Sequence, residues 1–394
     1  MSLRKKNILF LAHDALLYGP GRNLLTFIDE LIQRGYNCYV ILPSEGVLLD
    51  ALKKRNIKFA IIKTHWWISG AIELKSLHDY FTYYLSKDFL RRVYYRFYKP
   101  YYNIFVALPK FRVYLKKWDI DVVINNSMVS PMGILLKLRY RIPVLLYVGE
   151  SIHDIGNDMP YFIMKELMKL VDGQIYVSHY IKKQYRGAYT RYVRVVYNCL
   201  ERNQLNVPLV PRNEIRKFLM VGRISYKKGQ MTAVRAIHLL RDVYPSISLT
   251  IVGTGDSSDI EKYVVENNLQ NHVKLVGWTD HPEVYYRSCD CSIICSENEA
   301  FGKVIIESMA FGCPVIGRSV AAMPELIEDD KTGLLYYGDY IELAAKMKEL
   351  IDDPLKANRI AVNAYEYVNK TFSIDNTVNQ IEECINFCIK QVNN

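Results

Sequence analysis

Short apolar runs alternate with helical patterns along the whole chain. In the first half these runs are residues 7–13, 37–43, 59–63, 121–127, 144–150, 174–179 and 193–198. In the second half they are residues 217–222, 248–253, 273–278, 291–295, 314–317 and 333–337. Continuous apolar strands with helices between them are typical of parallel sheets covered on both faces. The pattern therefore predicts an α/β protein with two doubly wound, Rossmann-like sheets, whose ligands bind at the carboxyl ends of the strands.

A polar stretch at residues 201–216, which contains two prolines, interrupts this pattern. Such a composition is typical of a linker between domains. We therefore expect an N-terminal domain over residues 1–205 and a C-terminal domain over residues 206–370. From about Asp352 to the last residue the pattern is helical, and it contains no strand.

The composition describes a globular protein with a basic surface. Half of the 394 residues are hydrophobic and 23% are charged, and this length is sufficient for two cores. The formal net charge of +10 favours an anionic partner, which is a nucleic acid, a phosphorylated ligand or an anionic membrane surface.

No signal peptide and no apolar run of about 18 residues is visible in the sequence. We expect a cytoplasmic protein that is peripheral on the inner face of the plasma membrane.

The eight cysteines do not form a metal motif. Cys289, Cys291 and Cys295 resemble a partial zinc set, but no Cys-x-x-Cys pair or nearby histidine completes it. We expect reduced, buried thiols and no metal site.

One segment, residues 79–118, combines cations with aromatic residues. From Phe89 to Trp118 it contains no acidic residue. Aromatic rings beside cations suit the headgroup boundary of a membrane, and they also suit stacking on single-stranded nucleic acid. A third alternative is an ordinary amphipathic helical pair whose aromatic residues are core. We favour contact with an anionic membrane and expect no nucleic acid.

The stretch ENEAFGKVIIESMAFGCPV, residues 297–315, places two glutamates around the start of a predicted helix. Glu299 lies on the loop before the helix, and Glu307 lies a little over one turn inside it. The backbone N–H groups of the first turn, at Gly302, Lys303 and Val304, form an anion site. A ligand with a diphosphate between two sugars fits this arrangement, with Glu307 on a ribose and Glu299 on the second sugar. The alternative is that both are solvated surface acids.

A glycine loop follows the first predicted strand. Gly19 and Gly21 allow close approach of the backbone, and we expect a helix to open at about Arg22. The loop differs from the dinucleotide fingerprint Gly-x-Gly-x-x-Gly, so by itself it is a weak signal.

Two further loops follow predicted strands. Arg223 and Lys228 come after the first strand of the second half, and two cations suit a diphosphate. Glu150, His153 and Asp154 come after a buried strand of the first half, where a histidine beside an acid can contact a substrate. The alternative for a single cation in a loop is a solvated charge, and a single histidine beside an acid at a strand end is as often structural.

Together these motifs resemble the retaining GT-B glycosyltransferases of family 4. The two strongest matches are Glu299 and Glu307 with seven residues between them, and VGRISYKKG at residues 221–229. The stretch IVGTGD at residues 251–256 and the pair GW at residues 277–278 follow in the family's order. The resemblance covers nearly the whole chain. It implies two Rossmann-like domains facing across a cleft, with residues 371–394 as a C-terminal helix that packs back on the N-terminal domain.

The resemblance also implies roles for the site residues. The catalytic residues are His153, Glu299, Arg223 and Lys228. The donor-binding residues are Gly19, Gly21, Gly277, Trp278, Gly302, Lys303, Val304 and Glu307. On the acceptor side we expect Glu150, Asp154 and Arg22. Within this set Glu307 binds the ribose, Gly277 and Trp278 border the nucleobase, and His153 lies by the reacting carbon.

The function implied is metal-independent, retaining transfer of a hexose from a UDP- or GDP-sugar to a glycan or lipid-linked oligosaccharide, in bacterial cell-surface polysaccharide synthesis. The nucleotide sugar is a co-substrate, and no cofactor is expected. The alternatives are a nucleotide-sugar 2-epimerase of the same fold, which needs further acid/base groups, and a basic nucleic-acid-binding protein. The sequence departs from the family pattern at Cys295, where proline is common, at Asn198-Cys199, where Asn-Gly is common, and in the glycine loop.

Overall fold

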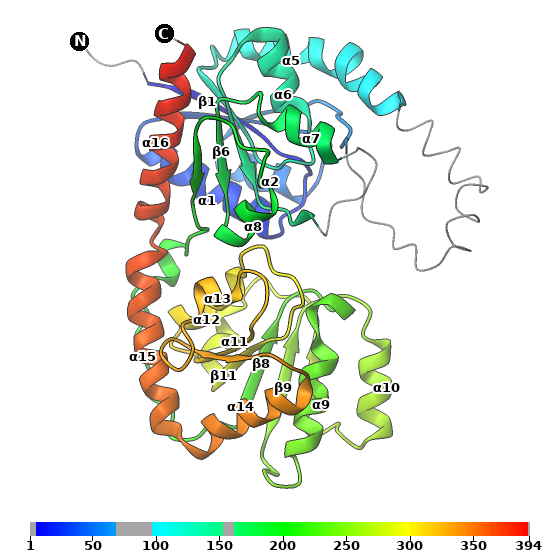
Figure 1. Cartoon of the computed structure of the whole chain (residues 1–394), viewed down its shortest axis with the longest axis vertical. Helices are drawn as coiled ribbons and strands as arrows, with labels where there is room; N and C mark the ends of the chain where they lie inside the picture. Colours follow the sequence, from blue (N-terminus) through cyan, green and yellow to red (C-terminus); the bar gives the residue numbers. More distant parts are fainter. Residues whose placement is uncertain (1–4, 68–96, 153–160, 393–394) are drawn as a thin grey trace, which may run out of the picture. The chain divides into compact units, whose positions relative to one another are not determined.

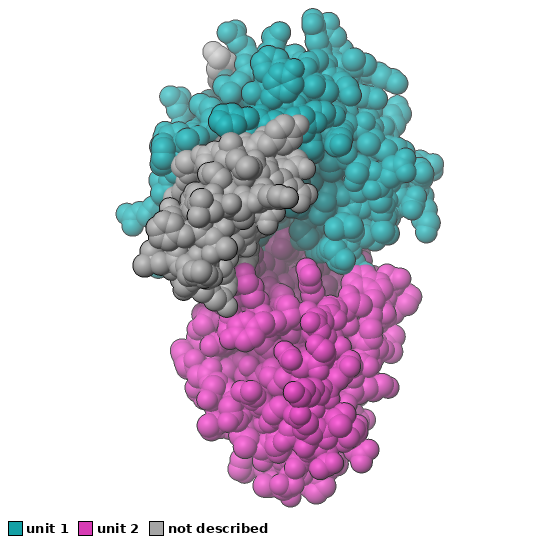
Figure 2. Space-filling view, turned by 90° about the vertical axis from the view of Figure 1, so that its right-hand side faces the viewer, with its two compact units in different colours: residues 1–197, 377–394 teal, residues 198–376 magenta. Residues whose placement is uncertain are grey.

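The chain divides into two compact units. A computed structural model describes residues 5–67, 97–152 and 161–392. Unit 1 comprises residues 1–197 together with 377–394, and unit 2 comprises residues 198–376 (Figure 2). Each unit has its own parallel sheet with helices around it (Figure 1).

The sheet of unit 1 has seven strands within the described residues, in the order β3-β2-β1-β4-β5-β6-β7. They are β1 (Asn7–Leu11), β2 (Asn37–Leu42), β3 (Lys58–Ile61), β4 (Val122–Asn125), β5 (Val144–Val148), β6 (Gly173–Tyr176) and β7 (Val193–Val195). Every pairing is parallel. The strand order reverses between β1 and β4, and ligands of open α/β sheets bind at the carboxyl ends beside such a reversal.

Helices cover this sheet because their apolar faces pack against its continuous apolar strands. They are α1 (Gly19–Gln33), α2 (Val47–Lys54), α5 (Leu108–Lys117), α6 (Met132–Tyr140), α7 (Tyr161–Met168), α8 (His179–Gln184) and most of α16 (Ile374–Val392). The last helix is bound to unit 1 at several points. Arg34 donates to Glu382 at 2.6 Å, and Tyr192 stacks on Phe387 with ring centroids 4.0 Å apart.

The described part of the basic aromatic segment, residues 97–118, is helical. It contains a π-helical turn, Tyr102–Ala107, followed by α5. Phe111 and Trp118 are buried, whereas Tyr101 and Phe105 are exposed and lie with their ring centroids 5.1 Å apart. This part therefore has both a core face and an exposed apolar face. Residues 79–96 of the segment lie outside the described residues, and no described helix is long and apolar enough to cross a membrane.

The sheet of unit 2 has six parallel strands within the described residues, in the order β10-β9-β8-β11-β12-β13. They are β8 (Lys217–Val221), β9 (Ser248–Val252), β10 (Val273–Val276), β11 (Cys291–Ile294), β12 (Val315–Arg318) and β13 (Leu334–Tyr336). The order reverses between β8 and β11, so their carboxyl ends are where a ligand of this unit is expected. The expected fold class, two doubly wound parallel sheets, is confirmed.

The helices of unit 2 are α9 (Gln230–Leu240), α10 (Ser258–Glu266), α11 (Glu283–Ser288), α12 (Lys303–Ala310), α13 (Met323–Leu326), α14 (Tyr340–Asp352) and α15 (Pro354–Thr371). A single large core joins α9, α14 and α15 to the sheet, with Ile237, Leu343 and Ile360 fully buried in it. Asp339 and Asp353 cap α14 and α15 by accepting backbone N–H bonds from Ile341 and Lys356.

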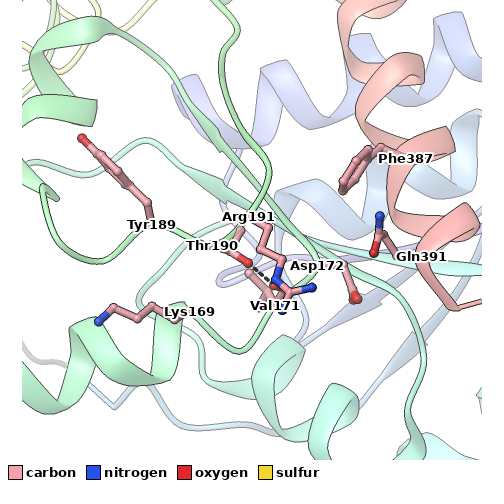
Figure 3. Close-up of a pocket in the computed structure, with 8 residues that line it drawn as sticks. All are labelled: Lys169, Val171, Asp172, Tyr189, Thr190, Arg191, Phe387 and Gln391. Atoms are coloured by element: carbon pink, nitrogen blue, oxygen red, sulfur yellow. Dashed lines mark hydrogen bonds between the residues drawn. The ribbon is translucent and has the colours of Figure 1, made fainter.

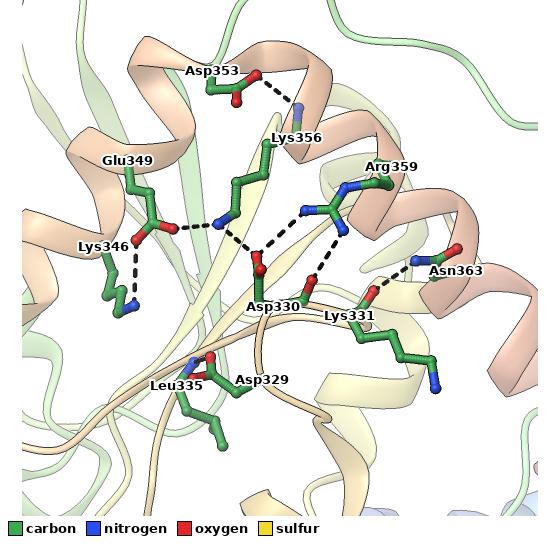
Figure 4. A network of polar contacts seen from close by, with 10 residues as sticks. All are labelled: Asp329, Asp330, Lys331, Leu335, Lys346, Glu349, Asp353, Lys356, Arg359 and Asn363. Atoms are coloured by element: carbon green, nitrogen blue, oxygen red, sulfur yellow. Dashed lines mark hydrogen bonds and ion pairs between the residues drawn. The ribbon is translucent and has the colours of Figure 1, made fainter.

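A network of ion pairs ties the loop before β13 to α14 and α15 (Figure 4). Lys356 lies 2.5 Å from both Asp330 and Glu349, and Arg359 lies 3.4 Å from Asp330. Burial opposes ionisation of Glu349, but its hydrogen bonds from Lys356 and Lys346 outweigh that and lower the pKa of its carboxyl. The network therefore holds its acids ionised.

Candidate functional site

The loop after β8 is held in a fixed shape by Gln230. The Gln230 side chain donates to the carbonyl of Arg223 at 2.9 Å and accepts from the backbone N–H of Ser225 at 3.3 Å. Gly229 adopts φ +70°, and a Cβ there would lie 2.6 Å from the carbonyl oxygen of Cys295. The glycine therefore lets the loops that follow β8 and β11 touch.

The structure brings Lys228 and Glu299 together from these two loops. The Lys228 ammonium forms an ion pair with Glu299 Oε1, and Ser296 Oγ donates to the same oxygen at 2.9 Å. The Glu299 side chain is 14% exposed, so it is not a solvated surface acid. Arg223 is exposed on the same loop as Lys228. Both sequence-predicted cations thus lie at the carboxyl end of β8, as expected for groups that receive a diphosphate.

Helix α12 begins directly after Gly302, which adopts φ +91°. A Cβ at this position would lie 2.9 Å from Ile305 Cδ1, so only glycine fits without strain. Glycine has no side chain with which to cap the helix, and the amides of Lys303 and Val304 belong to its first turn. Such a turn attracts anions because its N–H groups point along the axis away from the helix.

Glu307 is held from two sides within unit 2. Tyr286, on α11, donates its hydroxyl to Glu307 Oε2 at 3.2 Å, and Lys303 Nζ lies 3.9 Å from Oε1. Burial of Tyr286, followed by the charge of Glu307, raises the pKa of the tyrosine well above its usual value, so it remains a neutral donor. Glu307 is 13% exposed. These contacts orient the carboxylate, and carboxylate oxygens are acceptors for the hydroxyls of a ligand.

Gly277 and Trp278 follow β10, at the edge of the same sheet. Two strands, β9 and β8, separate β10 from β11, which places the strand ends about 14 Å apart along the sheet. Helix α11 follows this loop in the chain and carries Tyr286 to Glu307. Trp278 is 53% exposed. The predicted donor residues of unit 2 therefore all lie at the carboxyl edge of one sheet, spread over several strands.

In unit 1 the predicted glycine loop differs from expectation. Gly19 and Gly21 lie in the first turn of α1, which starts three residues before the expected Arg22. Pro20 explains this start, because its fixed φ and missing N–H suit the first turn of a helix. A Cβ on Gly21 would lie 2.3 Å from the carbonyl oxygen of Leu16, whereas Gly19 has open space around it.

Sequence reasoning missed a histidine in unit 1. His13 follows β1, with Nε2 3.3 Å from Asp14 Oδ2 and Nδ1 3.1 Å from the carbonyl of Asn126. Burial opposes its charged form, but Asp14, Glu150 and the Asn126 carbonyl outweigh that and raise the pKa of His13. The sequence signal that could have identified His13 is its position: His13 and Asp14 directly follow β1, which is one of the two strands between which the strand order reverses. The predicted His153 and Asp154 lie outside the described residues.

Two other features do not belong to the candidate site. Among the described residues no group of three or more histidines, cysteines or acids is placed to hold a metal, and the thiols of Cys289 and Cys313 lie buried 3.0 Å apart. A cavity of about 360 Å³ also lies in unit 1, and its lining includes Asp172, Arg191 and Phe387 (Figure 3). Asp172 and Arg191 precede β6 and β7, so the cavity lies at the amino edge of the sheet, opposite the carboxyl edge.

Two family models match adjacent parts of the chain. The model described as Glycosyltransferase Family 4 matches residues 18–204, and the model described as Glycosyl transferases group 1 matches residues 202–367. The chain belongs to this family of glycosyltransferases, and its fold is GT-B.

Individual relatives are distant. The chain is 30% identical to a glycogen synthase of Mycobacterium tuberculosis over 41% of its own length and 40% of that protein. It is 25% identical to the lipopolysaccharide core biosynthesis glycosyltransferase LpsE of Rhizobium meliloti, over 46% and 54% of the two chains. The chain thus spans about half the length of these relatives or less. The structure of Anabaena Alr3699/HepE in complex with UDP-glucose superposes with a TM-score of 0.74 at 19% identity, covering 96% and 98% of the two chains.

Proposed function

We propose that this protein is a retaining glycosyltransferase that moves a hexose from a nucleotide diphosphate sugar to a glycan or lipid-linked oligosaccharide. The proposal rests mainly on the ion pair between Lys228 and Glu299. The loop that holds Glu299 precedes α12, and α12 contains Glu307. Cations, oriented amides and two glutamates at one sheet edge match the phosphates and hydroxyls of such a donor.

In this proposal the donor half of the reaction depends on preorganised charge. Arg223, Lys228 and the amides of Lys303 and Val304 stabilise the charge that grows on the leaving diphosphate. Electrostatic stabilisation of this kind is often the largest single contribution to catalysis. Glu307 binds the ribose hydroxyls in the orientation set by Tyr286.

The stereochemistry follows from the role of Glu307. A carboxylate that binds the ribose cannot also be the nucleophile of a double displacement. Retention then arises when the acceptor attacks on the face that the diphosphate leaves, and the leaving phosphate accepts the proton of the acceptor hydroxyl. Glu299 contacts the transferred hexose while Lys228 neutralises its charge.

The donor and acceptor are proposed as classes. A UDP-hexose is favoured over a GDP-hexose because the HepE relative of similar fold was solved with UDP-glucose. An acceptor from cell-surface polysaccharide synthesis is supported by the name of the LpsE relative. We further propose that residues 79–118 contact an anionic membrane, which suits a lipid-linked acceptor. The exposure of Tyr101 and Phe105 supports this.

The proposal is tested by incubating the protein with UDP-glucose, UDP-galactose and GDP-mannose, with and without methyl glycosides as acceptors. We expect release of the nucleotide from one donor, and an α-configured product in NMR spectra. Glu299→Ala should abolish this turnover while leaving the melting temperature near that of wild type. A product with inverted configuration would contradict the mechanism, and an isomerised nucleotide sugar without nucleotide release would favour the epimerase.

A further inference from the structure

Side chains from three strand ends lie at the carboxyl edge of the sheet of unit 1. His13 and Asp14 follow β1, Trp66 follows β3, and Glu150 follows β5. Because all these strands are parallel, their carboxyl ends lie on the same edge of the sheet. The reversal of strand order between β1 and β4 lies within this group, so this is the position where the sheet favours a ligand.

Trp66 presents an indole ring in a fixed orientation. Its Nε1–H donates to the carbonyl of His13 at 2.6 Å, and its ring centroid lies 5.9 Å from that of His13 at an interplanar angle of 45°. Trp66 is nevertheless 40% exposed. The adjacent Trp67 differs, because it is buried and donates to the carbonyl of Met128 at 2.7 Å. Trp67 is therefore a core residue, whereas Trp66 offers part of its ring to a ligand.

Asp14 supplies an oriented acceptor beside this ring. One carboxylate oxygen contacts His13 Nε2 at 3.3 Å, and the other accepts the backbone N–H of Leu16 at 3.1 Å. Burial favours the neutral acid, but the hydrogen bond and charge of His13 outweigh it and lower the pKa of Asp14. An ionised carboxylate has about four lone-pair sites, so Asp14 retains capacity for ligand hydroxyls.

The charge balance of the group selects among ligands. Asp14 and Glu150 carry two negative charges, and His13 carries at most one positive charge. Both imidazole nitrogens are already engaged, with Asp14 and with the carbonyl of Asn126. A phosphate or carboxylate would therefore be repelled, whereas a hydroxyl group that donates a hydrogen bond would be attracted.

We propose that Trp66 and Asp14 form a subsite for an uncharged pyranose ring of the acceptor, with His13 as a positioning residue. The apolar face of the sugar stacks on the Trp66 ring, and its hydroxyls donate to Asp14. This inference rests on the proposed glycosyl transfer and deepens it, since it names the chemical class of the acceptor end: a neutral sugar, as opposed to a sugar phosphate or a uronic acid.

The test is saturation-transfer NMR on the whole protein with four probes: methyl α-D-glucopyranoside, methyl β-D-galactopyranoside, glucose 6-phosphate and galacturonic acid. We expect at least one neutral glycoside to bind more tightly than either anionic sugar. Trp66→Ala should weaken its binding about tenfold, and Trp66→Phe should restore part of the loss because an aromatic face remains. Tyr337→Ala, at an exposed aromatic residue of unit 2 that has no role in either proposed site, is the matched control and should leave binding unchanged.

Three outcomes overturn the inference: no glycoside binds, an anionic sugar binds best, or Trp66→Ala binds as wild type does. The melting shift with UDP, measured on the same variants, separates this inference from the proposed function. Retention of the UDP shift in Trp66→Ala together with loss of glycoside binding supports both. Failure of UDP to bind wild type, with Trp66-dependent glycoside binding intact, would overturn the proposed function alone.

Discussion

At the scale of single residues, the pair formed by Lys228 and Glu299 is the most informative contact. The two side chains come from loops 71 positions apart in the chain; Glu299 is largely removed from solvent, and Lys228 is about one-third exposed. Each partner therefore sets the charge environment of the other, and a donor sugar entering between them would meet both a cation and an acceptor oxygen.

Lys228→Ala should lower turnover by about 100- to 1,000-fold, because it removes a preorganised cation from the leaving diphosphate. Steady-state release of nucleotide from the donor sugar measures this. Lys227→Ala is the matched control, since Lys227 is the exposed neighbour on the same turn, and it should retain nearly full turnover. Equal loss in the two variants would show that general surface charge, and not this contact, supports the reaction.

Sequence reasoning identified Glu307 but not the residue that orients it. Tyr286 lies 21 positions upstream, on a different helix, and only the folded sheet brings its hydroxyl to the carboxylate. Sequence reasoning likewise did not identify the contact of Trp66 with His13. Trp66 follows β3 and His13 follows β1, and β2 lies between these two strands in the sheet. Periodicity identifies the edge on which a residue lies, but it does not report contacts between distant segments.

At the scale of elements, the strands were predictable and the helix starts were less so. All thirteen predicted apolar runs correspond to strands of the described chain. Most of these strands are buried along their length, and strands buried on both faces consist of continuous apolar residues. Helix α1 starts three residues before the expected Arg22, because Pro20 suits the first turn of a helix although the two glycines favour a loop. The π-helical turn at Tyr102–Ala107 leaves no comparable sequence signal.

The ion-pair network of α14, α15 and the loop before β13 predicts a pH dependence of stability (Figure 4). The pKa of Glu349 is lowered from 4.5 in the folded protein, so its contribution is present above that value and is lost as pH falls through the lower, folded pKa. Lys356→Met should remove this contribution, which is below about 1 kcal/mol because the acid is partly exposed.

Urea unfolding of wild type and Lys356→Met between about pH 5 and pH 3 measures the effect. The gap in unfolding free energy between the two proteins should shrink as the pH falls. Lys331→Met is the control, because Lys331 pairs only with its exposed neighbour Glu328 in the described contacts. A gap that stays constant down to pH 3 would mean that Lys356 contributes packing and not charge.

At the scale of the whole molecule, the net charge of +10 and the exposed aromatic residues of unit 1 suggest association with a membrane. Vesicles with and without an anionic lipid, sedimented at low and high salt, test this. We expect binding only to the anionic vesicles, weakened by salt. Phe105→Ser should weaken it about tenfold, because one phenyl ring is no longer buried in the interface.

Val243→Ser, at an exposed apolar residue of unit 2, should leave vesicle binding unchanged. Equal binding to neutral vesicles would show that charge does not direct the protein to a membrane. Binding to single-stranded RNA at the same affinity as to anionic vesicles would favour a nucleic-acid-binding surface instead.

The central claim is that unit 2 binds a nucleotide through Glu307, and thermal melting with a panel of nucleoside diphosphates and their sugars tests it most directly. A ligand at 100 times its Kd stabilises the native state by about 2.7 kcal/mol. We expect that one nucleotide family, UDP, raises the melting temperature of wild type and of Glu297→Ala, but not of Glu307→Ala; Glu297 is an exposed acid on the loop that precedes α12. A shift of equal size in Glu307→Ala, or no shift with any nucleotide in wild type, would contradict it.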